Sequence, residues 1–188
     1  GLTERGHDSA EGWLFPETYR FSRGHPAEAI LTKAHDRMRA ILKEEWAGRA
    51  ADLPLDSAYE ALILASIVEK ETAVPSERPL IASVFVNRLR DGMRLQTDPT
   101  VIYGMGDSFD GNLQRQDLRR PTPYNTYTSA GLPPTPIANP GRAAIKAACQ
   151  PADSDYRYFV SRGDGSHVFS ETLDEHNRAV RRYQLGEH

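Results

Sequence analysis

An apolar helix constrains this chain more than any other feature of its sequence. Residues 57–71 show helical spacing, and the run Leu62–Val68 is apolar around most of the helical circumference. A helix of this kind is normally buried in a protein core. Ser57 and Glu60 have the spacing of a capping box, which predicts that the helix begins at this point.

Two acidic residues end this helix, and they point in different directions. Glu69 and Glu71 lie about 200° apart on an ideal helix, so they cannot face the same groove. Glu71 follows apolar residues three, four and seven positions earlier, which places it on the apolar face. A carboxyl group there loses hydration, which raises its pKa and lets it donate a proton near neutral pH. Alternatively, both acids are solvated charges at a frayed helix end.

Length and composition favour one ordinary water-soluble domain. The chain has 188 residues, of which 39% are hydrophobic and 26% charged, with a net charge of −3. Lys and Arg are scattered along the chain, so nucleic acid is not an expected partner. The longest apolar run, Ala61–Val68, is too short to span a bilayer. The single cysteine, Cys149, excludes an intrachain disulfide and is expected to be a buried apolar residue.

The remaining pattern predicts an α+β fold, with a mainly helical domain and a small antiparallel β element. Helical periodicity predicts further helices over 26–46, 141–150 and 173–183, and Ser170 or Thr172 is expected to cap the last of these. Another helix is predicted between a cap at Ser76 and a stop at Gly92. Residues 156–160 and 167–169 read as strands, and the Gly-rich segment between them predicts a hairpin. We expect one domain over 1–188.

A long segment rich in Gly, Pro and Tyr, residues 93–140, is expected to form the active-site loop region. Asp98, next to Gln96 and before a proline, is either a second carboxylate opposite the helix acid or a simple cap. Asn125 and Tyr127 combine an amide with an aromatic ring, a combination that binds sugars. Gln96, Asn125 and Tyr127 are expected to position sugar hydroxyls or the N-acetyl group, and Asp98 is a further expected substrate-binding residue. The alternative is that the aromatic residues of this segment are core residues that close the loop.

Other reaction types find little support in the sequence. His167 and His176 have no acidic or cysteine residue at ligand spacing, so neither a metal site nor a cofactor is expected. Ser66 and Ser129 lack the glycine-flanked turn of hydrolase nucleophiles, which argues against acyl transfer.

Several segments, in order along nearly the whole chain, resemble the YceG-like endolytic murein transglycosylases (MltG family), bacterial enzymes that cut glycan strands within peptidoglycan. The matching segments are Gly12–Tyr19, Ala65–Thr72, Ser83–Leu89, Met93–Gly104, Tyr124–Tyr127, Gly131–Pro134, Ile137–Gly141 and Tyr158–Val160. The chain departs from the family pattern at Glu17, where Asp is commoner.

The resemblance implies a catalytic glutamate at the second acid of Glu-Lys-Glu, which is Glu71. It also implies a single-pass membrane protein whose catalytic part faces the periplasm, with the anchor and a LysM-like region missing from this chain. Peptidoglycan glycan strands would be the substrate, and cell-wall synthases such as penicillin-binding proteins would be partners.

With one convincing acid, we expect Glu71 to protonate the glycosidic oxygen between MurNAc and GlcNAc and then to accept a proton from the C6 hydroxyl that attacks C1. The product would carry a 1,6-anhydro-MurNAc end, and no second catalytic carboxylate is needed. A two-carboxylate hydrolase would recruit Asp98 instead. A non-catalytic peptidoglycan-binding or scaffold module is the alternative from another class.

Overall fold

The computed structural model describes residues 9–24 and 26–186. Its helices are α1 (Ala27–Ala47), α2 (Ala58–Glu71), α3 (Arg78–Arg90), α4 (Asp98–Met105), α5 (Arg142–Cys149) and α6 (Leu173–Gln184), with short 3-10 turns at Pro75–Glu77, Gly106–Ser108 and Asp117–Arg119. Strands β1 (Tyr158–Ser161) and β2 (His167–Ser170) form an antiparallel hairpin in which Tyr158 pairs with Ser170. The predicted α+β class is confirmed.

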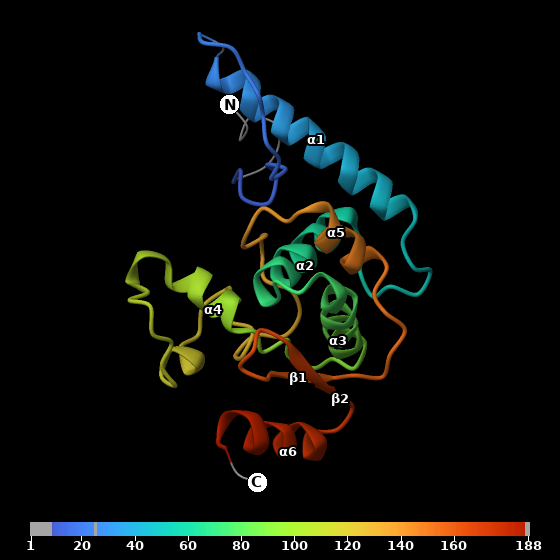
Figure 1. The fold of residues 1–188 in the computed structure, drawn as a ribbon, viewed down its shortest axis with the longest axis vertical. Coiled ribbons are helices and arrows are strands. Elements are labelled where there is room, and N and C mark those ends of the chain that lie inside the picture. Colours follow the sequence, from blue (N-terminus) through green and yellow to red (C-terminus); the bar gives the residue numbers. More distant parts are fainter. Residues whose placement is uncertain (1–8, 25, 187–188) are drawn as a thin grey trace.

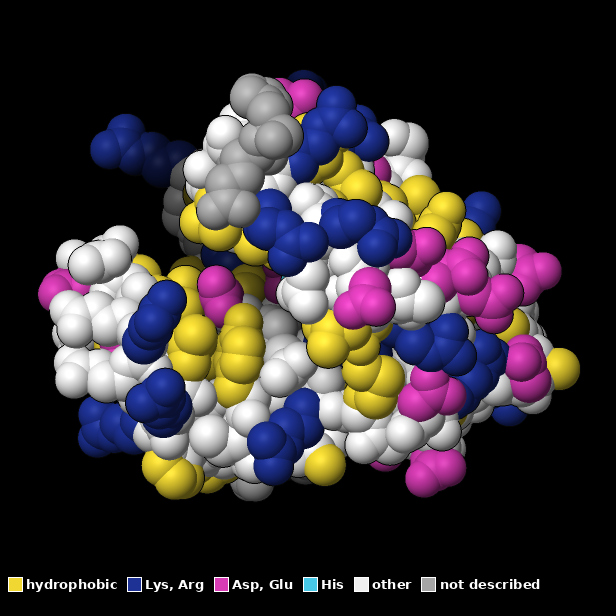
Figure 2. Space-filling view, turned by 90° about the horizontal axis from the view of Figure 1, so that it is seen from below, with side chains coloured by type: hydrophobic (Ala, Val, Ile, Leu, Met, Phe, Trp, Pro, Cys, Tyr) yellow, Lys and Arg dark blue, Asp and Glu magenta, His cyan; other side chains and the backbone are white. Residues whose placement is uncertain are grey.

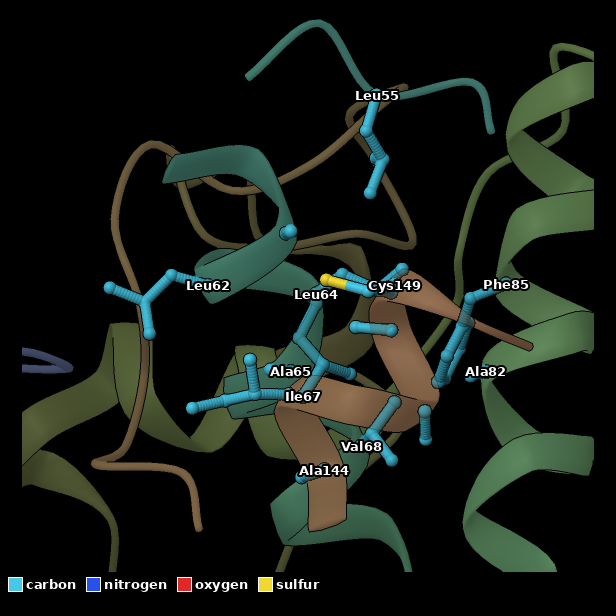
Figure 3. Close-up of a cluster of buried hydrophobic side chains, with 14 of the residues drawn as sticks. Leu55, Leu62, Leu64, Ala65, Ile67, Val68, Ala82, Phe85, Ala144 and Cys149 are labelled. Atoms are coloured by element: carbon cyan, nitrogen blue, oxygen red, sulfur yellow. The ribbon is translucent and has the colours of Figure 1, made fainter. Parts of the chain in front are cut away.

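Helix α2 is the centre of the core, as its apolar circumference predicts. It packs most extensively against α5 and also contacts α1, α3 and α4. Leu64, Ile67 and Val68 are all 0% exposed, and Figure 3 shows them beside side chains from α3 and α5. Cys149 lies in this cluster, and burial raises the pKa of its thiol to about 11. The expectation that Cys149 is a buried residue is therefore confirmed.

The other elements are arranged around this core in Figure 1. Helix α1 lies on one side, and the β hairpin covers α3 on the opposite side. Helix α6 packs on the outer face of the hairpin, while α4 and the segment after it form a separate lobe. The end of α2, the hairpin, α6 and the start of α4 all contribute residues to one cavity.

The starts of α2 and α6 follow the predicted chemistry with one difference. Ser57 accepts a hydrogen bond from the Glu60 backbone N–H at 3.3 Å. The Glu60 carboxylate, however, accepts from the backbone N–H of Asp56 at 2.7 Å rather than from Ser57. Thr172, and not Ser170, caps α6 with a full capping box.

The predicted cap at Ser76 is wrong. Residues Pro75–Glu77 form a 3-10 turn, and α3 begins only at Arg78, with no side chain capping it. The segment 93–140 is also more regular than predicted, because it contains α4 and two 3-10 turns. Pro75 in the 3-10 turn, Pro79 in the first turn of α3 and Pro99 in the first turn of α4 each have the backbone angle that a helical turn needs.

The described residues contain no helix that is both long enough and apolar enough to cross a membrane. Basic and acidic side chains alternate over the face in Figure 2, and neither kind gathers there into a large patch.

Candidate active site

A cavity of about 480 Å³ opens between the end of α2, the segment before α4, the β hairpin and α6. Figure 2 shows the surface hollowed between the lobe that carries α4 and the part that carries α6. Its polar and aromatic lining residues are Glu71, Arg88, Gln96, Asp98, Tyr127, Tyr158, Phe159, Ser161, His167, His176 and Gln184. Its walls mix apolar and polar groups, as expected of a site that binds an amphipathic ligand such as a sugar.

Glu71 is the acid of this cavity. It is the last residue of α2, it is half-buried, and its Oε1 accepts a hydrogen bond from the Thr97 hydroxyl. Burial raises the pKa of Glu71 from 4.5 to about 7, and the negative charge of Asp98 adds to the rise. The hydrogen bond from Thr97 and the charge interaction with His167 lower the pKa of Glu71, but by less than burial and Asp98 raise it. Near neutral pH this carboxyl group therefore exists in both the protonated and the ionised form.

Glu69 faces elsewhere, as the helical geometry predicts. Its Oε2 accepts the backbone N–H of Gly141 at 3.1 Å, so it fixes the segment before α5. It is not part of the cavity lining. Thus neither acid is simply a solvated charge at a frayed helix end.

Three of the four predicted sugar-binding residues line the cavity with Glu71: Gln96, Asp98 and Tyr127. Gln96 is exposed and has a positive φ of 53°, an uncommon conformation for a residue other than glycine. The Tyr127 hydroxyl donates to Asp98 Oδ1 at 2.5 Å. Burial and the neighbouring Asp98 raise the pKa of Tyr127, so its phenol keeps its proton. Asp98 therefore accepts from a tyrosine rather than capping α4.

The fourth, Asn125, is not brought into the cavity. It is 0% exposed, and its amide nitrogen donates to three backbone carbonyls between residues 117 and 120, at 2.8–3.2 Å. Its Oδ1 accepts the backbone N–H of Tyr127 at 2.9 Å. Asn125 thus holds the loop in shape and positions Tyr127. Of the aromatic residues in this loop, Tyr124 packs on the core and Tyr127 lines the cavity.

A carboxylate–histidine pair beside Glu71 was not anticipated from the sequence. Glu77 accepts the His167 backbone N–H at 2.9 Å, and its Oε2 lies 2.7 Å from His167 Nδ1. Burial alone would raise the pKa of Glu77, but these hydrogen bonds outweigh burial and lower it. The Thr72 hydroxyl also donates to Glu77, so this carboxylate ties the end of α2 to β2. Glu77 and His167 are 90 positions apart in the sequence, so no local motif predicts that they form a pair.

Across residues 9–24 and 26–186, no group of three or more His, Cys, Asp or Glu side chains is placed to share a metal ion. What the cavity does offer is one carboxyl group with a pKa near neutrality, flanked by hydroxyl, amide and aromatic groups. These are the functional groups of a general acid–base site that binds a polar ligand from solvent.

The fold and the cavity thus define a mainly helical α+β domain with a half-buried acid of raised pKa, Glu71, at the wall of an open cavity. The chain belongs to the YceG-like family, whose family model matches residues 2–182. An endolytic murein transglycosylase of Bacillus subtilis is 40% identical over 92% of this chain and 48% of its own length. A protein of the same name from Streptococcus pneumoniae is 32% identical over 90% of this chain and 31% of its own.

A solved structure agrees with this membership. The crystal structure of a YceG-like protein from Listeria monocytogenes, at 2.6 Å, superposes with a TM-score of 0.78 at 40% sequence identity. The match covers 90% of this chain and 55% of that chain. This chain therefore spans about half of the Bacillus and Listeria proteins, and about a third of the Streptococcus one.

Proposed function

We propose that this domain is the catalytic part of an endolytic peptidoglycan lytic transglycosylase, with Glu71 as its acid and base. The observation that carries the proposal is the pKa of Glu71, raised to about 7 by burial at the wall of an open cavity. The names of the Bacillus and Streptococcus relatives support the same activity.

In the first step, the protonated Glu71 donates its proton to the glycosidic oxygen between MurNAc and GlcNAc as the bond from C1 breaks. An acid with a pKa near the working pH is the most effective donor, because it is still protonated yet gives the proton up readily. The Thr97 hydroxyl, donating to Oε1, holds the carboxyl group in one orientation and stabilises the carboxylate that forms.

In the second step, the Glu71 carboxylate takes a proton from the C6 hydroxyl of MurNAc as its oxygen attacks C1. Glu71 thereby regains its proton, and the strand ends in a 1,6-anhydro ring without consuming water. An attack from within the same sugar benefits from a high effective concentration, so no second catalytic carboxylate is needed. Asp98, the only other acid lining the cavity in the described chain, already accepts the Tyr127 hydroxyl and suits a binding role.

Gln96, Asp98 and Tyr127 bind the sugar hydroxyl or N-acetyl groups in this proposal. All three line the cavity, and they offer an amide, a carboxylate and an aromatic ring. Asn125 acts through Tyr127, whose backbone N–H it fixes. Asn125 is therefore a positioning residue rather than a direct ligand.

The setting of the reaction follows from its substrate. Peptidoglycan lies outside the cytoplasmic membrane, so the domain acts at the periplasmic or outer face. We include in the proposal a membrane anchor on the full-length protein, action on nascent strands in cell-wall assembly, and an association with cell-wall synthases such as penicillin-binding proteins.

The test is digestion of purified sacculi by the wild type and by two matched variants. Glu71→Gln keeps the shape of the side chain but cannot donate the proton, so release of anhydro-muropeptides should cease. Glu69→Gln makes the same change two residues earlier, outside the cavity, and should stay active. Full activity of Glu71→Gln would overturn the assignment, and loss in Glu69→Gln alone would transfer it to Glu69. Sugar binding without any cleavage by the wild type would favour a scaffold module.

A further inference from the structure

Arg88, on α3, carries a buried positive charge that no carboxylate in the described part of the chain neutralises. Arg88 is only 8% exposed, and it lines the same cavity as Glu71. Burial is the main cause that lowers the pKa of Arg88 below its ordinary value. Because a buried charge is costly unless it is paired, an unpaired guanidinium facing a cavity is a reason to look for an anion.

The contacts of Arg88 leave one end of the guanidinium free. Nε donates to the backbone oxygen of Arg157 at 2.6 Å, and Nη1 donates to that of Leu95 at 2.8 Å. Nη1 also lies 3.2 Å from the backbone oxygen of Arg94 and 3.4 Å from Gln96 Oε1. All of these acceptors are neutral. Nη2 has no hydrogen-bond partner among the described residues, and it is not among the nitrogen atoms sealed from solvent.

The surroundings of this free end hold the guanidinium in place. The carbon centre of the guanidinium lies 5.1 Å from the centroid of the Tyr158 ring. His176 from α6 stacks on the Tyr158 ring, and the two ring centroids are 5.2 Å apart. Burial and the charge of Arg88 lower the pKa of His176. This histidine is therefore neutral at neutral pH and does not compete with Arg88 for an anion. A planar cation that is fixed by its neighbours and free at one end suits a carboxylate ligand.

We propose that Arg88 is a specificity-determining residue that binds a carboxylate of the substrate. The inference rests on the proposed function, because a peptidoglycan strand carries its carboxylates on the peptide stems of MurNAc. The preferred substrate is accordingly a strand whose stems bear free rather than amidated carboxylates. Held at Arg88, the stem fixes which glycosidic oxygen lies against Glu71.

The experiment compares two ligands of identical glycan length, whose stems bear either free or amidated carboxylates. Both are titrated by calorimetry into the folded Glu71→Gln variant, which keeps the cavity but does not consume the ligand. The free carboxylate should bind about 10-fold or more tightly, as expected for a charge-assisted hydrogen bond. The difference should shrink as salt is added.

Further variants in the Glu71→Gln background assign this difference to a residue. Arg88→Gln should abolish the discrimination, whereas Arg88→Lys should retain part of it. Arg90→Gln is the matched control, because Arg90 lies two residues along the same helix and its charge is already paired with Asp52 at 2.6 Å. Arg90→Gln should discriminate like the parent protein. If Arg88→Gln does not fold, Arg88→Lys carries the assignment, and discrimination by Arg88→Lys equal to that of the parent protein overturns the role of Arg88.

The outcomes separate this inference from the proposed function. Equal affinity for the two ligands overturns the role of Arg88, even if the wild type cleaves sacculi. Discrimination that persists in a folded Arg88→Gln variant overturns it as well. Discrimination that depends on Arg88, together with a wild type that cleaves nothing, supports the anion site and refutes the transglycosylase.

Discussion

The buried acid makes the folding stability of this domain depend on pH in a direction that can be worked out in advance. Glu71 has a pKa of about 7 in the folded chain, against 4.5 for an ordinary glutamate. Between these two values the folded state holds a proton that the unfolded state has lost. The free energy of unfolding of the wild type should therefore decrease as the pH rises from about 4.5 to about 7.

The size of this effect follows from the difference between the two pKa values. At about 1.36 kcal/mol per pKa unit, the loss of stability amounts to about 3 kcal/mol. In a domain of this length it corresponds to a fall in Tm of about 6–12 °C. Glu71→Gln removes the titrating group, so the variant should gain about 3 kcal/mol relative to the wild type over this range.

Urea unfolding of the wild type and of Glu71→Gln, at several pH values from about 4 to about 8, measures this difference. Taking the difference between the two proteins cancels the other titrating groups. Glu69→Gln serves as the control for the same chemical change outside the cavity. A difference between wild type and Glu71→Gln that is constant over the whole pH range would refute the reasoning that burial shifts Glu71.

Three further predictions concern the site and the core. The kcat/KM of the wild type for peptidoglycan fragments should fall by about tenfold per pH unit above about 7, because Glu71 loses its proton; a rate that stays flat at higher pH would contradict this. Tyr127→Phe should lower kcat/KM by about tenfold while leaving the Tm nearly unchanged, because it removes only the hydroxyl that donates to Asp98; an unaltered kcat/KM would show that this hydroxyl does not act in binding. Leu64→Ala should lower the free energy of unfolding by about 2–5 kcal/mol, measured by urea denaturation, because Leu64 is 0% exposed; a loss under about 1 kcal/mol would mean that α2 is not the centre of the core.

Much of the fold could be predicted from the sequence, because its signals are local. The apolar circumference of residues 58–71 predicts a buried helix, and the glycines between the two strands predict a hairpin. The direction of Glu71 away from Glu69 also follows from helical geometry alone. The predicted cap at Ser76 failed because a 3-10 turn precedes α3 at that point, and the serine pattern does not distinguish the two.

The rest of the site depends on contacts between distant parts of the chain. Thr97 meets Glu71 across 26 positions, and His167 meets Glu77 across 90. Asn125 looked like a sugar ligand because its residue type suits that role, but its amide is fully used by the backbone around it. Residue type suggests a chemistry, whereas only the packing decides whether the group is free to perform it.

In the proposed reaction a single acid drives an attack from within the substrate, so that water takes no part. Digestion of purified sacculi in water enriched in heavy oxygen, followed by mass spectrometry of the new glycan ends, tests it most directly. We predict ends that are one water lighter than reducing ends and that contain no heavy oxygen. Reducing ends that have gained one heavy oxygen atom would instead identify a hydrolase and contradict the mechanism.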